Sequence, residues 1–248
     1  MLRTLKEEKM SELKAVLFDL DDTLFDHRYS SREGLKAVWK RYTCFHNITI
    51  DEFEQEYLKL LEVIHFSHVL FGKLTLEEAR TERFKHAFLN QGVQVDYHTA
   101  SNAAAIYRNK YKTQRRKVKG AEELIKALHK DYKIGVISNH TNAETKEKLH
   151  YLGYEKYLDS YTTAEEVGVA KPTPRIFRIA LEKLEVKPSE SVMVGNSWDA
   201  DITGAYNLGI RCVWLNIYGE KCPDPSKAVE IKSLANTERV LKLIKKHK

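Results

Sequence analysis

The chain of 248 residues has few cysteines and no long apolar run. Its cysteines, Cys44, Cys212 and Cys222, are odd in number and have no metal-site spacing, which argues against a disulfide scaffold. No segment approaches the roughly 18 apolar residues of a membrane span. Residues 1–14 mix basic and acidic side chains without an apolar centre, so we expect no signal peptide there. Reduced thiols in a cytoplasmic protein without a membrane partner are therefore expected.

Internal repeats, low-complexity segments and Gly/Pro-rich linkers are also missing. Hydrophobic residues at 42% and charged residues at 31% are typical of a globular protein with a charged surface. The net charge is +6, but most basic residues are scattered among acidic ones and no nucleic-acid motif is present. Solvated helix ends explain the basic clusters at 115–119 and 242–248, so no nucleic-acid partner is expected.

Strand patterns lie in two parts of the chain. One buried-strand pattern covers 15–18, and the others come after residue 130, at 133–137, 191–194 and 210–215. Helical segments are predicted at 121–130, 142–152 and 174–184, the last with Thr173 as N-cap and Pro174 at its first position. This alternation predicts an α/β fold with a doubly wound parallel sheet.

The segment between the first strand and the others has a different pattern. From about residue 30 to 117 apolar and aromatic residues recur at helical spacing, and no alternating strand pattern is present. This predicts an all-helical insertion of about four helices. Its aromatic residues are expected to form the interior of the bundle rather than to bind a ligand.

Acidic residues follow the first strand directly, in the stretch Asp19-Leu20-Asp21-Asp22-Thr23. A parallel strand delivers such residues to its carboxyl end, where ligands bind in open α/β sheets. Two carboxylates held close together repel each other unless a cation or a shared proton intervenes. The pair Asp19 and Asp21 suits covalent catalysis, with one nucleophile, one general acid/base and a divalent metal. An ordinary acidic turn is the alternative.

Polar residues also follow later strands. Ser138-Asn139 comes after the strand at 133–137 and suits anion binding, although it also resembles an ordinary turn. Lys171 precedes a predicted helix and could neutralise crowded carboxylates or a phosphate. The loop 195–201 brings further acids, Asp199 and Asp201, which suit Mg²⁺ or a helix cap.

Taken in order, these motifs resemble the haloacid dehalogenase-like hydrolase superfamily. The resemblance is to the subfamily with a helical cap inserted after the first motif, and it covers essentially the whole chain from about Leu13. It implies a Rossmann-like core at 13–27 and 118–248, a mobile helical cap at 28–117 and a phosphatase-type site. It also implies bound Mg²⁺ and a small phosphorylated substrate.

The resemblance implies a role for each motif residue. Asp19 would attack phosphorus and form an aspartyl-phosphate, while Asp21 would act as general acid and then base. Thr23 would orient the loop, Ser138 and Asn139 would bind the phosphoryl group, and Lys171 would bridge Asp19 and the phosphate. The implied metal ligands are Asp19, Asp21 through its carbonyl, Asn196 and Asp201.

One position departs from the family pattern. Asn196 stands where an Asp is usual, and an amide contributes less charge to a cation. Asp201 is expected to compensate, with Asp199 as the alternative.

Three other functions remain open at this point. Asp21 argues against a 2-haloacid dehalogenase, whose halide leaving group needs no proton. A phosphosugar mutase keeps Asp21. A non-catalytic binding protein would not need Asp19, Asp21, Ser138 and Lys171 together.

Overall fold

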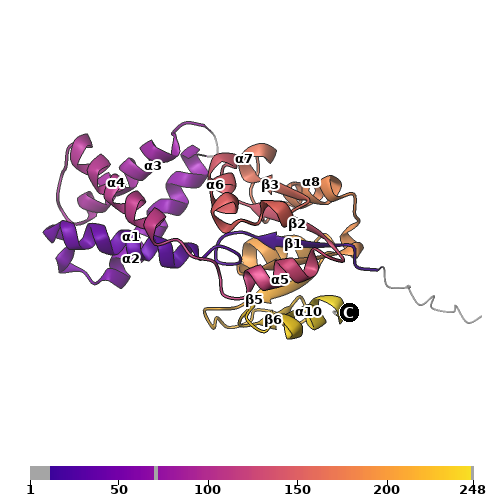
Figure 1. Cartoon of the computed structure of the whole chain (residues 1–248). Coiled ribbons are helices and arrows are strands. Elements are labelled where there is room, and N and C mark those ends of the chain that lie inside the picture. The colour runs from indigo at the N-terminus through magenta and orange to yellow at the C-terminus, as the bar shows by residue number, and fades with distance from the viewer. Residues whose placement is uncertain (1–11, 70–71, 247–248) are drawn as a thin grey trace, which may run out of the picture. The chain divides into compact units, whose positions relative to one another are not determined.

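The computed structural model describes residues 12–69 and 72–246. These form two compact units, which we call the core unit (described residues up to Leu24 and from Val118) and the helical unit (Phe25–Lys117). Both are drawn in Figure 1. Residues 1–11, which carry most of the predicted mixed-charge start, and Lys248 of the basic tail lie outside the described residues.

A six-stranded parallel sheet forms the centre of the core unit as described, in the order β3-β2-β1-β4-β5-β6. The strands are β1 Ala15–Asp19, β2 Lys133–Ser138, β3 Ser160–Thr163, β4 Ser191–Gly195, β5 Arg211–Leu215 and β6 Val229–Ile231. From β1 the chain proceeds to one side through β2 and β3, and then to the other through β4, β5 and β6. This confirms the predicted doubly wound sheet, with its switch point between β1 and β4.

The central position of β1 follows from its sequence. All four residues from Ala15 to Phe18 are fully buried, because β1 pairs with β2 on one side and β4 on the other. Four strands appear where the sequence predicts them, whereas β3 and β6 do not follow a predicted strand. β3 is a polar edge strand and β6 has only three residues, so neither carries the apolar run by which buried strands are predicted.

Helices connect and flank the strands of the core unit (Figure 1). They are α5 Ala121–Leu128, α6 Asn142–Leu152, α7 Ala164–Val167, α8 Pro174–Leu184, α9 Gly204–Tyr206 and α10 Thr237–Lys246. The predicted Thr173 is the N-cap residue of α8, with Pro174 in its first turn. Helix α8 packs against β2 and β3, while α5 packs against β2 and α10. No helix in the described part of the chain has the length and apolarity to cross a membrane.

The described residues of the helical unit contain four α-helices: α1 His27–Arg41, α2 Ile50–Ile64, α3 Leu76–Asn90 and α4 Tyr97–Thr113. Helices α2 and α3 each begin at a capping box, Thr49 with Glu52 and Thr75 with Glu78. Helix α4 packs against both α1 and α3. As predicted, aromatic side chains fill the interior, and the stacked or tilted rings include Phe45, Phe53, Tyr57, Phe84, Phe88 and Tyr107.

Candidate active site

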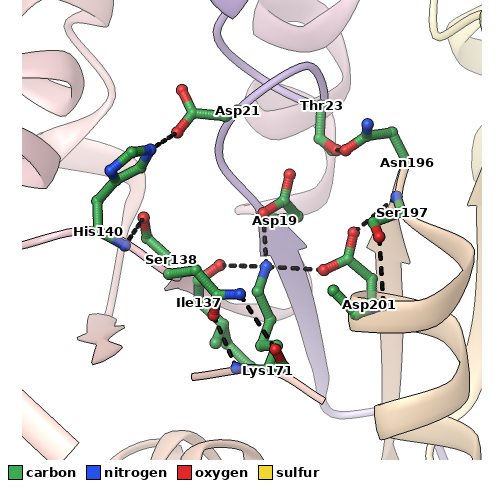
Figure 2. Close-up of polar contacts among 12 residues, drawn as sticks. Asp19, Asp21, Thr23, Ile137, Ser138, His140, Lys171, Asn196, Ser197 and Asp201 are labelled. Atoms are coloured by element: carbon green, nitrogen blue, oxygen red, sulfur yellow. Dashed lines mark hydrogen bonds and ion pairs between the residues drawn. The ribbon is translucent and has the colours of Figure 1, made fainter. Parts of the chain in front are cut away.

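The candidate site lies at the carboxyl end of β1, where Asp19 is the last residue of the strand. Asp19 is 8% exposed, and its Oδ1 lies 2.5 Å from the Nζ atom of Lys171. The same Nζ contacts Asp201 Oδ1 at 2.7 Å and donates to the carbonyl oxygen of Ile137 at 3.0 Å. Figure 2 shows this ammonium group between the two carboxylates. Lys171 therefore neutralises two buried acids at once.

Burial and charge act together on this trio. Burial raises the pKa of Asp19 to about 7, although the ammonium group of Lys171 opposes the shift. For Lys171 burial favours the neutral amine, but the carboxylates of Asp19 and Asp201 outweigh it and hold its pKa above the ordinary value. Lys171 is therefore a fixed positive charge at the site.

The loop after β4 supplies Asp201 rather than Asp199 to this trio. Asp201 is 1% exposed, and its Oδ2 accepts a hydrogen bond from the Ser197 main-chain N–H at 3.0 Å. Asp199 is exposed. Gly195 makes the arrangement possible, because a Cβ there would lie only 2.4 Å from Asp201 Oδ2. The choice between the two acids thus depends on the close approach of the Asp201 side chain to the end of β4.

Asn196 places one amide atom near three oxygens, 3.2 Å from Thr23 Oγ1, 3.2 Å from Asp19 Oδ2 and 3.0 Å from the Asp21 main-chain oxygen. An amide nitrogen at this position donates to all three. An amide oxygen accepts from the Thr23 hydroxyl instead, as Figure 2 shows, and then lies 3.2 Å from the Asp19 oxygen and 3.0 Å from the Asp21 oxygen. In an octahedron with ligands at about 2.1 Å, neighbouring ligands lie about 3.0 Å apart. The spacing of these oxygens therefore suits Mg²⁺.

The chemical nature of the groups around the Asn196 amide also limits the kind of metal that could bind there. Within the described residues, no three or more His, Cys, Asp and Glu side chains form a group that could hold a metal ion. The donors present are a carboxylate oxygen, a main-chain carbonyl and an amide, which are ligands of hard cations rather than of zinc or copper. The predicted ligand Asp201 faces Lys171 and Ser197, and its direct contact with a metal stays a prediction.

Ser138 and Asn139 follow β2, as the sequence predicts, but they make different contacts. Ser138 is 1% exposed and its Oγ accepts a hydrogen bond from the main-chain N–H of His140 at 3.2 Å. The Asn139 side chain accepts from the main-chain N–H of Lys171 at 2.7 Å and donates to its carbonyl oxygen at 3.1 Å. Asn139 thus fixes the backbone of Lys171, which the sequence did not predict. Its predicted contact with a phosphate stays a prediction.

Asp21 extends to a second basic group. Its two carboxylate oxygens lie 2.7 and 2.8 Å from the Nζ atom of Lys148, and its Oδ2 lies 2.8 Å from His140 Nε2. The carboxylate is turned toward His140 in Figure 2. Just after it the backbone bends sharply, because Asp22 has a φ of 60°, which is uncommon outside glycine.

The sequence-based prediction missed His140 and Lys148. His140 stands two residues after Ser138 in the same strand-end loop. Lys148 shares the buried face of α6 with Thr145, Leu149 and Leu152, at helical spacing. A lysine at a position that helical spacing assigns to the buried face was therefore the available sign of a buried charge. Spacing alone does not reveal which acid pairs with it.

A model of the haloacid dehalogenase-like hydrolase family matches residues 13–209. Glyceraldehyde 3-phosphate phosphatase from Methanothermobacter thermautotrophicus is 34% identical over 82% of this chain and 86% of the relative. Ribulose-1,5-bisphosphate 5-phosphatase from Halopiger xanaduensis is 31% identical over 91% of this chain and 92% of the relative. The structure of the HAD-hydrolase YfnB from Bacillus subtilis, bound to magnesium, has a TM-score of 0.73 at 21% identity and covers 94% of this chain and 100% of YfnB.

Proposed function

Because the chain belongs to the haloacid dehalogenase-like hydrolase family, as its motifs predict, we propose that it is a Mg²⁺-dependent phosphatase for a small phosphorylated metabolite. The observation that carries this proposal is the environment of Asp19. One oxygen of this buried carboxylate is paired with Lys171, and the other lies 3.2 Å from an Asn196 amide atom that is also 3.0 Å from the Asp21 main-chain oxygen. The named relatives are phosphatases, which supports the same reaction class.

In the first step Asp19 attacks the phosphorus atom. A bond forms between its carboxylate oxygen and phosphorus while the bond from phosphorus to the leaving oxygen breaks. Asp21 gives a proton to that leaving oxygen, which departs as an alcohol. Lys171 and Ser138 stabilise the charge on the phosphoryl oxygens, so positioning and charge neutralisation provide most of the rate enhancement.

In the second step water attacks the phosphorus of the aspartyl-phosphate. Asp21 takes the proton of this water, and the bond between phosphorus and the Asp19 oxygen breaks. Inorganic phosphate leaves and Asp19 returns to its starting state. The presence of Asp21 favours this reaction over dehalogenation, in which the leaving halide needs no proton.

Asp19, the carbonyl of Asp21 and Asn196 would hold the Mg²⁺. When bound, the cation offsets the negative charge that the phosphoryl group brings to Asp19. Asp201 fixes Lys171 beside this position. The predicted location in the cytoplasm is part of the same proposal.

We assign the choice of substrate to the helical unit, acting as the predicted cap at 28–117. Such a unit can exclude water and contact the organic part of a substrate while the core unit carries the reacting groups. The relatives named above act on glyceraldehyde 3-phosphate and on ribulose-1,5-bisphosphate, which points to short phosphorylated sugars and aldehydes as the first substrates to test.

A screen of phosphorylated metabolites and p-nitrophenyl phosphate, with and without Mg²⁺, tests the proposal. Release of inorganic phosphate that requires Mg²⁺ is the expected result. Asp19→Asn should abolish turnover and leave the folded state intact by circular dichroism and thermal melting. Asp199→Asn is the matched control, because it removes an exposed acid from the segment after the neighbouring strand β4.

Phosphate release by Asp19→Asn at the wild-type rate would refute the covalent mechanism. Transfer of the phosphoryl group to another hydroxyl of the sugar, without release of phosphate, would instead identify a mutase.

A further inference from the structure

Two buried lysines hold the two acids of the first motif, and the mechanism above uses only one of them. Lys171 pairs with Asp19, while Lys148 is 1% exposed and contacts both carboxylate oxygens of Asp21. Burying an ammonium group is strongly unfavourable unless a well-placed anion compensates for it. The contact between Lys148 and Asp21 supplies that compensation.

The contacts to Asp21 come from two different elements. Lys148 projects from the middle of α6, whereas His140 lies in the loop between β2 and α6. Lys148 touches both oxygens at 2.7 and 2.8 Å, and His140 Nε2 touches one of them at 2.8 Å. A carboxylate held at both oxygens from two directions has a defined orientation, which a general acid/base needs in order to reach the leaving oxygen.

We infer that Lys148 is a positioning residue for Asp21, assisted by His140. This inference rests on the proposed phosphatase function. It gives Lys148, a residue outside the four sequence motifs, the role of orienting the general acid/base. Loss of Lys148 should therefore damage the steps in which Asp21 moves a proton and spare those that depend on Asp19 alone.

The dependence on the leaving group tests this role. Lys148→Met should lower the rate of the first step about 10- to 100-fold for glycerol 3-phosphate, whose alkoxide needs a proton. The burst of p-nitrophenol from p-nitrophenyl phosphate should change less than about threefold, because that leaving group needs little protonation. Lys146→Met, an exposed lysine in the same helix, is the matched control and should behave as the wild type.

A double-variant cycle separates positioning from structural damage. In an Asp21→Asn background, Lys148→Met should cause less than about a twofold further loss, since the group it positions is already gone. Equal losses for both leaving groups, or full additivity with Asp21→Asn, would overturn the inference. If Lys148→Met does not fold, Lys148→Arg and His140→Asn test the same pattern. A wild type without phosphatase activity would refute the proposed function instead.

Discussion

The two units use buried polar groups in different ways. In the core unit, the buried charges Asp19, Asp201, Lys171 and Lys148 gather at the carboxyl end of the sheet and pair with neighbouring groups. In the helical unit the interior is mostly aromatic, and a carboxylate such as Glu54 pairs with Arg32 of another helix. The core unit therefore has its chemistry fixed by charge pairing, whereas the helical unit has its shape fixed by ring packing.

Because of this difference, we expect substitutions in the two units to affect different properties, catalysis in the core unit and stability in the helical unit. A substitution among the paired charges should affect the reaction first, because these groups include Asp19 or hold Asp19 and Asp21 in place. A substitution among the rings should affect folding first, because a lost ring leaves a cavity.

Lys171→Met should have the largest effect on activity. It leaves the carboxylates of Asp19 and Asp201 buried near each other without their shared cation, and it removes the group that we propose to face the phosphate. We expect a loss of about 10³-fold in kcat/KM. Steady-state kinetics beside a thermal melt measures both effects, and a loss below tenfold would contradict the central role of this ammonium group.

Phe84→Ala should show the opposite pattern. Phe84 is fully buried between Tyr57 and Tyr107, with ring centres at 5.1 and 5.6 Å. Its truncation should lower the free energy of unfolding by about 3–5 kcal/mol. Urea unfolding measures this loss. Activity on p-nitrophenyl phosphate should stay close to wild type while the protein remains folded. A loss of activity without a loss of stability would contradict the view that the rings serve mainly stability.

Asn196→Asp should tighten Mg²⁺ binding, because it adds a full negative charge beside the Asp19 carboxylate and the Asp21 carbonyl. We expect the half-saturating Mg²⁺ concentration to fall about tenfold. Asp201→Ala should raise it, since Lys171 would lose one partner and pair more strongly with Asp19. Titration of activity against Mg²⁺ in the three proteins measures the shifts, and an unchanged value in all of them would mean that this loop does not hold the metal.

Asp199→Asn should have the smallest effect of the series. Its side chain is exposed, in contrast to the buried Asp201 two residues later. Activity, Mg²⁺ dependence and melting temperature should all match the wild type. A loss of more than about fivefold in activity would return Asp199 to the list of functional acids.

The sequence by itself determined the parallel sheet, the positions of Asp19, Ser138 and Asn196 at strand ends, and the position of Lys171 just before a helix. Apolar runs and helical spacing are local patterns, and parallel topology then brings the strand ends to one edge. The edge strands β3 and β6 escaped prediction because they are short and at the border of the sheet, where little apolar burial is required.

Only the tertiary structure decided which side chains meet. It placed Asp201 and not Asp199 beside Lys171, with the Asp201 side chain so close to the end of β4 that only a glycine fits at position 195. In the folded protein the Asn139 side chain binds the main chain of Lys171. Lys148 contacts Asp21, which lies 127 residues earlier in the sequence. Such contacts depend on the register of packed elements, which no local pattern encodes, so the partners of Asp19 and Asp21 became visible only in the folded protein.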